Sequence, residues 1–242
     1  MVTHPDLPAA FDFILQVERF YAALIPAADA DSGGDPGLGG KLLYAGDLVQ
    51  GRALAVAGNI AGAASLCATA DAEAQKQAIR DGIADFLVTS LDEALRILKN
   101  EIRKRETVAV CVAAAPEAVE REMLERGVLP DLLAPADADE SQSLLTWSVA
   151  TAPAFWLPKL DAIALDCLSP GDGAARRWLR LAPRYLGRLA QGIRLLRCDE
   201  QTALRFRARV REAVDGGEIP VPVEVQFSPP AASIRAQSSF TP

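Results

Sequence analysis

"KLLYAGDLVQGRALAVAGNIAGAASLCATAD", residues 41–71, is the stretch that decides the fold of this chain. Its pattern predicts a strand over residues 41–48, a helix over 51–62 and an apolar strand over 64–70. The alternation continues, with helices expected at 71–82, 91–105 and 116–127 and strands at 84–90, 107–115 and 129–135. Apolar strands that alternate with helices are typical of a parallel sheet covered on both faces. We therefore predict an α/β fold with a Rossmann-like core over residues 41–138.

Different patterns flank this core on both sides. Residues 1–40 contain an amphipathic stretch at 11–25, expected to be a helix, and then a loop rich in Gly, Asp and Pro. Residues 139–242 begin in a polar acidic break and contain one possible strand and an apolar helix within 144–168. Arginine-rich helices are expected at about 174–191 and 200–214, then an edge strand within "EIPVPVEVQF" and a flexible tail. We therefore predict a mainly helical C-terminal extension.

The composition narrows the class of protein. The net charge of −7 argues against a general nucleic-acid binder. The four cysteines have neither metal-ligand spacing nor the density of a disulfide scaffold, so we expect reduced core cysteines in a cytoplasmic protein. The first ten residues lack the pattern of a signal peptide. Residues 53–70 are uncharged, but they are rich in Ala and Gly and are better explained by a buried helix and strand than by a membrane span.

The loop after the first predicted strand is the candidate phosphate-binding element. A dinucleotide-binding loop has the pattern G-x-G-x-x-G, whose glycines allow backbone N–H groups to approach a pyrophosphate. The corresponding stretch "AGDLVQGRA" keeps Gly46 and Gly51 and lacks the middle glycine. Asp47 would repel a phosphate and Leu48 would crowd it, whereas Arg52 would compensate in part as a phosphate ligand.

The second requirement of a dinucleotide site is an acid after the next strand, which binds the ribose hydroxyls. Thr69 stands there, and Asp71 is better explained as a helix N-cap. The candidate pocket is therefore the carboxyl edge of the sheet, with Gly46, Asp47, Gly51, Arg52, Thr69 and residues 113–116. We favour a Rossmann sheet without a bound nucleotide and keep a working NAD site as the alternative.

Other chemistry finds little support in the sequence, and we nominate no catalytic residue and no metal ligand. His4 is the single histidine, which argues against His-dependent nucleophilic catalysis and leaves no histidine metal cluster. Cys111 lies within a predicted strand and is better explained as core than as a nucleophile. Asp137, Asp139 and Glu140 would coordinate a cation weakly or form a solvated loop, and we favour the loop. The small residues of "GNIAG" (58–62) predict close packing of a helix on the sheet rather than a ligand contact.

Arginines dominate one part of the chain. Residues 176–211 hold eleven arginines and two acids, a net charge of +9, which leaves −16 for the remainder. Three interpretations compete: ion pairing with the acidic half within the chain or across a dimer, binding of a phosphorylated or nucleic-acid ligand, and a solvated surface. We favour ion pairing. The following list gives the predicted stripes and the interleaved aromatics: Arg176, Arg180, Arg184 and Arg188; Arg205 and Arg209; Arg207 and Arg211; Trp178, Tyr185 and Phe206.

Four stretches carry a resemblance to a known family. They are "LGGKLLYAG" (38–46), "AVAGNIAG" (55–62), "DEALRILKNEIRKR" (92–105) and "EREMLERGVLPDLL" (120–133). In this order they resemble the central, NAD-binding domain of the urocanase (urocanate hydratase) family, over about residues 37–138. The last stretch is the most specific, because Glu125-Arg126-Gly127 followed by Pro130-Asp131 repeats the family's order before a strand.

The resemblance implies a Rossmann-like fold and a shared ancestry, and this sequence departs from the family at the cofactor. The family's loop is "TAGLGGMGGAQ", of which Ala45 and Gly46 remain. The family's ribose acid aligns with Thr69, its Gly-Asn-Ala after the fourth strand aligns with residues 113–115, and its polar His-bearing run aligns with "APADADE" at 134–140. The family adds water to urocanate with NAD as an electrophile, and the separate domain that holds its substrate has no counterpart here.

From these observations we expect a urocanase-like Rossmann protein that is a binding or assembly module rather than an enzyme, and that is not a functional urocanate hydratase on its own. A homodimer is the expected assembly. The alternative is a repurposed domain that binds NAD or another small phosphorylated ligand through arginines, acting with a partner. Nucleic-acid binding and membrane association are disfavoured.

Overall fold

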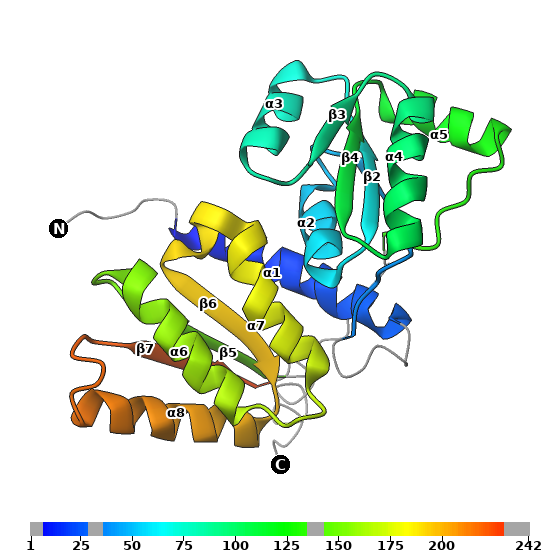
Figure 1. Cartoon of the computed structure of the whole chain (residues 1–242). Coiled ribbons are helices and arrows are strands. Elements are labelled where there is room, and N and C mark those ends of the chain that lie inside the picture. The colour runs from blue at the N-terminus through cyan, green and yellow to red at the C-terminus, as the bar shows by residue number, and fades with distance from the viewer. Residues whose placement is uncertain (1–6, 29–35, 135–142, 230–242) are drawn as a thin grey trace, which may run out of the picture. The chain divides into compact units, whose positions relative to one another are not determined.

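The structure is a computed structural model that describes residues 7–28, 36–134 and 143–229. The chain divides into two compact units (Figure 1). The central unit comprises residues 16–138, and the C-terminal unit comprises residues 139–242 together with residues 1–15. The boundary falls within the first helix, α1 (Leu7–Leu24), which is followed by the short 3-10 helix η1 (Ile25–Ala27).

The central unit is built on a four-stranded parallel sheet with the order β1-β2-β4-β3. Its strands are β1 (Leu42–Asp47), β2 (Ala64–Ala68), β3 (Phe86–Val88) and β4 (Val108–Val112). All three pairings are parallel, which confirms the predicted parallel α/β core. The strand expected at 129–135 is present only as a single parallel bridge between Leu132 and Leu43.

Four helices connect these strands: α2 (Arg52–Ala61), α3 (Ala72–Arg80), α4 (Leu91–Lys104) and α5 (Pro116–Glu125). The steps β1 to β2 and β2 to β3 cross the sheet in one direction, and the step β3 to β4 returns. Because such crossovers are right-handed, α2 and α3 belong on one face and α4 on the other. Figure 1 shows α2 and α4 on opposite sides of the sheet, so helices cover both faces.

Successive strand residues point to opposite faces of the sheet. Leu66 and Val110 face one side and form a buried cluster with Leu95 and Leu98 of α4 and Val119 of α5. The opposite face receives α2, which packs closely because Gly58 lacks a side chain. A Cβ added at Gly58 would lie 2.5 Å from Leu43 Cδ2 and 2.7 Å from Ser65 Oγ. The small residues of "GNIAG" therefore pack against the sheet, as the sequence predicts.

Helix ends follow local sequence signals. Asp71 is the N-cap of α3, where its Oδ1 accepts hydrogen bonds from the backbone N–H groups of Glu73 and Ala74 at 2.8 and 3.2 Å. Ser90 Oγ caps α4 by accepting from the N–H of Glu93. Gly62 ends α2 with φ of +90°, a conformation that glycine adopts without strain. The predicted role of Asp71 as an N-cap is confirmed.

The C-terminal unit contains a three-stranded antiparallel sheet with the order β6-β5-β7. Its elements are β5 (Ser143–Ser148), α6 (Pro153–Cys167), α7 (Gly173–Leu186), η2 (Gly187–Gln191), β6 (Ile193–Cys198), α8 (Glu200–Asp215) and β7 (Glu224–Ser228). The prediction of a mainly helical extension is wrong, because "IRLLRC" forms β6 between the two arginine-rich helices. The edge strand predicted before the tail is confirmed as β7.

A buried ion pair ties this unit together. Arg194 of β6 donates from Nε to Asp161 Oδ2 of α6 at 3.0 Å, and the two side chains are 11% and 12% exposed. Trp147 of β5 donates from Nε1 to Asp161 Oδ1 at 3.3 Å, and its ring packs on Phe206 of α8. Burial raises the pKa of Asp161, and the Arg194 guanidinium opposes that shift. The carboxylate thus links two strands and a helix.

None of the described helices is long and apolar enough to span a membrane. The uncharged run at residues 53–70 folds as predicted into α2 and β2, whose residues are almost all buried.

We predict that Gly58→Val destabilises the fold by about 1–3 kcal/mol, because its methyl groups must displace Leu43 and Ser65 in a packed interior. The measurement is urea unfolding followed by far-UV circular dichroism. Gly171→Ala is the matched control, since a Cβ at Gly171 meets no atom within 4 Å. Equal midpoints for the two variants would show that the approach of α2 to the sheet is not tight.

A second prediction concerns the buried carboxylate. Asp161→Ala removes one partner of a buried pair and leaves the Arg194 charge uncompensated, which costs about 3–5 kcal/mol. Tryptophan fluorescence during urea unfolding reports the C-terminal unit, because all three tryptophans belong to it. Asp166→Ala, an exposed position on the same helix, should change stability by less than about 0.5 kcal/mol. A loss at Asp161 as small as that at Asp166 would contradict the proposed network.

Candidate functional site

The strand order places a topological switch point between β2 and β4. The chain leaves β2 toward α3 on one face of the sheet and leaves β4 toward α5 on the other. In open α/β sheets, ligands bind in the crevice outside the carboxyl ends of the strands at such a point. Thr69 follows β2 and Ala113 follows β4, so both predicted site residues border this crevice. The β1–α2 loop lies next to it.

The β1–α2 loop uses its own polar groups internally. Asp47 Oδ1 accepts a hydrogen bond from the N–H of Val49 at 3.1 Å, and the Asp47 carbonyl accepts from the N–H of Gly51 at 2.6 Å. Leu48 donates its N–H to the Ala68 carbonyl at 2.9 Å and is only 3% exposed. A phosphate-binding loop presents free N–H groups to its ligand. Here at least three of these donors bind within the protein.

The two retained glycines have different roles. Gly46 adopts φ of +71°, and a Cβ added there would meet no atom within 4 Å. Position 51 has no room for a side chain, because an added Cβ would lie 2.0 Å from the Ala45 carbonyl oxygen. Gly46 therefore serves backbone conformation beside open space, and Gly51 serves the close return of the chain into α2.

Arg52, the predicted phosphate ligand, lies at the first position of α2 and forms an ion pair with Asp81. Its Nη2 lies 2.6 Å from Asp81 Oδ2, and the side chains are 37% and 30% exposed. The other Asp81 oxygen accepts from Gln77 Nε2 at 2.8 Å. Arg52 thus ties the start of α2 to the end of α3, and this partner was not anticipated from the sequence. No local pattern signals it, since the two residues are 29 positions apart.

Thr69 is 3% exposed, and its oxygen atoms accept hydrogen bonds from residues close to it in the chain. Its Oγ1 accepts from the N–H of Asp71 at 3.3 Å, and its carbonyl accepts from Gln75 Nε2 at 2.8 Å. The Thr69 N–H donates to the Val112 carbonyl at 3.1 Å, across the switch point. These hydrogen bonds close the end of β2.

The segment after β4 is apolar. Residues 113–115 are alanines, and Pro116 begins α5 with no side-chain cap. The N–H of Ala113 donates to the Val88 carbonyl, and that of Ala114 donates to the Val112 carbonyl. Of the predicted site residues, Gly46, Asp47 and Thr69 meet at the carboxyl ends of β1 and β2, residues 113–116 border them, and Arg52 is held by Asp81.

Two cysteines lie beneath this edge. Cys67 and Cys111 are directly paired on β2 and β4, and each is 1% exposed. A hydrogen bond from Cys67 lowers the pKa of the Cys111 thiol, and the same interaction together with burial raises the pKa of Cys67. The sequence identified Cys111 as core, but it could not reveal this neighbour, because the lateral order of the strands sets it.

These residues do not fit an NAD molecule bound as in a dinucleotide site. A pyrophosphate at the β1–α2 loop would meet the Asp47 carboxylate, and the N–H groups of Leu48, Val49 and Gly51 are already bonded within the protein. The ribose hydroxyls would find Thr69 with its oxygens engaged, while Asp71 Oδ1 is engaged in capping α3.

Metal binding and histidine chemistry find no further support in the described ranges. Within residues 7–28, 36–134 and 143–229, no group of three or more His, Cys, Asp or Glu side chains could hold a metal ion. His4, Asp137, Asp139 and Glu140 lie outside the described residues.

Several arginines of the C-terminal unit interact with residues near them in the sequence or the fold. Arg176 donates to the carbonyls of Leu168 and Ser169, and Arg205 donates to the Cys167 carbonyl. Arg209 lies 3.8 Å from Glu212, and Arg184 lies over the ring of Tyr185.

Two of the three aromatics between these arginines, Trp178 and Phe206, belong to the core. Trp178 is 4% exposed and donates to the Leu195 carbonyl, and Phe206 is fully buried against Trp147. Neither ring is accessible as a stacking platform for a nucleic-acid base.

One comparison with known proteins bears on the central unit. The family model described as "Urocanase Rossmann-like domain" matches residues 21–138, just under half of the chain. This match confirms the resemblance drawn from the four sequence stretches. It covers the parallel sheet and the β1–α2 loop and ends where the C-terminal unit begins.

We predict that the native protein is inert toward a chromogenic disulfide reagent on the minute timescale. A lowered pKa favours the Cys111 thiolate, but the four cysteines are only 1–6% exposed and reagents cannot reach their sulfur atoms, so burial decides the rate. All four cysteines should react after unfolding in guanidinium.

Val49→Cys, at a position that is 57% exposed, is the positive control and should react within seconds to minutes. Rapid reaction of one thiol in the native wild type that disappears in Cys111→Ser would contradict the prediction.

Proposed function

We propose that this protein, whose residues 21–138 match the model of the urocanase Rossmann-like domain, keeps that family's fold as a binding or assembly module and does not bind NAD or hydrate urocanate. The main support for the proposal is that the β1–α2 loop binds several of its own polar groups. The Asp47 carboxylate accepts from the N–H of Val49 inside this loop and would repel a phosphate bound there, and Leu48 is buried with its N–H bonded to Ala68. The loop is complete without a ligand.

The polar groups beyond the loop support the same proposal. Thr69 and Asp71 are held by the start of α3, and three alanines follow β4. The match to the family model also ends at residue 138, so the C-terminal unit is not supported as a counterpart of a urocanase substrate domain.

Exposed apolar side chains support an assembly role. In the central unit, Leu124, Leu129 and Leu133 are 73%, 76% and 61% exposed, and Phe86 and Leu87 are 47% and 42% exposed. Exposed apolar groups that gather in patches mark surfaces that contact other molecules. With four reduced and buried cysteines, the proposed setting is the cytoplasm, and the proposed assembly is a homodimer.

One observation favours a second candidate, a repurposed site for a small phosphorylated ligand. Arg52 is 37% exposed at the N-terminus of α2, beside a loop in which Gly46 borders open space. An anion there would compete with Asp81 for the guanidinium and would gain from the helix dipole. Under this alternative, Arg52 supplies the contact that the loop has lost.

We predict that NAD at millimolar concentration leaves the thermal midpoint unchanged. A ligand at a hundred times its dissociation constant would stabilise the native state by about 2.7 kcal/mol, which a thermal scan resolves easily. Inorganic phosphate and a nucleoside monophosphate are tested in the same way.

A rise with NAD that disappears in Arg52→Ala overturns the proposal in favour of the repurposed site. Arg80→Ala, an exposed arginine at the end of α3, is the matched control and should keep any such rise.

A further inference from the structure

The outer edge of the central sheet is apolar and open. β3 is an edge strand of three residues and pairs with β4 alone among the described strands. Phe86 and Leu87 point to opposite faces of the sheet and are 47% and 42% exposed. Natural proteins protect such edges with charges, prolines or a covering element, because an open edge pairs with other strands. β3 ("FLV") has one such protection in its short length, but it contains no charge and no proline.

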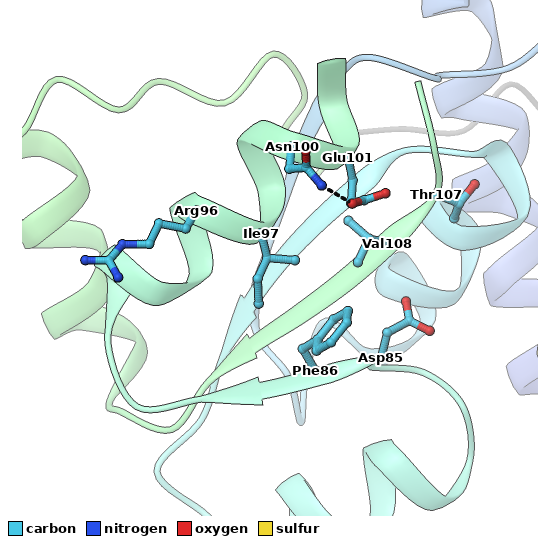
Figure 2. Close-up of a pocket in the computed structure, with 8 residues that line it drawn as sticks. All are labelled: Asp85, Phe86, Arg96, Ile97, Asn100, Glu101, Thr107 and Val108. Atoms are coloured by element: carbon cyan, nitrogen blue, oxygen red, sulfur yellow. Dashed lines mark hydrogen bonds between the residues drawn. The ribbon is translucent and has the colours of Figure 1, made fainter. Parts of the chain in front are cut away.

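A groove of about 690 Å³ runs along this edge between β3 and α4 (Figure 2). It exists because α4 packs mainly on β4 and β2 and leaves β3 largely uncovered. Phe86, Ile97 and Val108 form its apolar middle. Its volume suits the side chains of another polypeptide, and its floor is continuous with an unpaired strand edge.

The two ends of the groove carry opposite charges. Helix α4 runs antiparallel to β3, so Arg96 lies toward one end, and Asp85 and Glu101 lie toward the other, as Figure 2 shows. A second copy related by a two-fold axis through the middle would reverse this order. Arg96 of each copy would then face Asp85 and Glu101 of the other. Glu101 already pairs with Lys104 at 2.9 Å and Asp85 accepts from the Ala109 N–H at 2.8 Å, so Arg96 would add to these interactions and the groove is charge-complementary to itself only in part.

We propose that the β3 edge is the interface of a homodimer, in which β3 pairs antiparallel with β3 of a second copy and the two sheets become one. The inference deepens the assembly role proposed above and rests on it. It names the surface, the partner and the charged pairs that set the register of the two copies.

The spacing of strands and helices agrees with this arrangement. Two β4 strands separated by a β3 pair lie about 14 Å apart, since neighbouring strands are about 4.8 Å apart. Helices that pack directly lie at 8–10 Å, so the two α4 helices would leave a gap between them. Phe86 from each copy fills that gap, which accounts for a large aromatic side chain at an exposed edge.

The first test is the molar mass in solution by sedimentation over a hundredfold range of concentration. The wild type is expected to be a dimer. Phe86→Asp and Arg96→Glu should each raise the dimer dissociation constant by about tenfold or more, because every substitution acts twice across a two-fold axis. Lys99→Glu, an exposed charge reversal on α4 that does not line the groove, should leave the dissociation constant unchanged.

A charge exchange makes the test specific. Arg96→Glu combined with Glu101→Arg restores opposite charges across the axis and should recover most of the affinity that Arg96→Glu loses. Leu87→Cys, at the centre of the edge strand, should form a disulfide between two copies under mild oxidation, because the four native thiols are buried. Circular dichroism melting curves confirm that each variant is folded.

The possible results test the proposed interface and the proposed assembly role separately. A dimer that survives Phe86→Asp, Arg96→Glu and the double exchange unchanged overturns this interface and leaves the assembly proposal standing. A monomer at every concentration overturns both. If hydrogen exchange in that monomer shows β3 protected, and removal of residues 230–242 abolishes the protection, the occupant of the groove is the chain's own C-terminal segment.

Discussion

The right-handed crossover between parallel strands is the constraint on which most of the central unit depends. The chain crosses the sheet from β1 through β2 to β3 and then returns to β4, so α2 and α4 are forced onto opposite faces. The reversal creates the switch point between β2 and β4, where Thr69 and Ala113 lie. The same strand order leaves β3 outermost, with one side unpaired among the strands that the structure describes. The candidate site and the proposed interface are thus both consequences of topology, and the side chains only decide what each location does.

The sequence predicted the elements of the central unit well, because their signals are local. Continuous apolar runs marked the buried strands, and Asp71 marked the start of a helix through hydrogen bonds to residues two and three positions ahead. The order of the strands has no local signal, since a buried strand reads the same next to any neighbour. The sequence therefore could not predict that Cys67 pairs with Cys111 or that Phe86 is exposed.

The incorrect prediction of a mainly helical C-terminal extension has a physical cause. "IRLLRC" carries two arginines inside an arginine-rich region, and charge at an inward position argues against a strand. Arg194 is nevertheless accommodated, because Asp161, 33 positions earlier, neutralises it at 3.0 Å, and the Ala190 and Ile193 carbonyls accept further hydrogen bonds. Only tertiary structure supplies these partners. Some of these arginines therefore have a structural role within their own unit. Arg176 and Arg205 donate hydrogen bonds to backbone carbonyls, and Arg194 pairs with the Asp161 carboxylate.

The β1–α2 loop shows how the loss of a ligand and the gain of a stable loop can be the same change. A loop that presents unpaired N–H groups to a phosphate is poorly satisfied when no ligand binds, and unsatisfied buried donors cost about 1–3 kcal/mol each. Asp47 supplies an acceptor for the exposed N–H of Val49, and Leu48 contributes a buried side chain together with a hydrogen bond to β2. These are the two residues that repel and crowd a phosphate. If the protein does not bind NAD, as proposed above, Asp47 and Leu48 stabilise the loop without any loss of function. Selection for stability alone would then favour both residues.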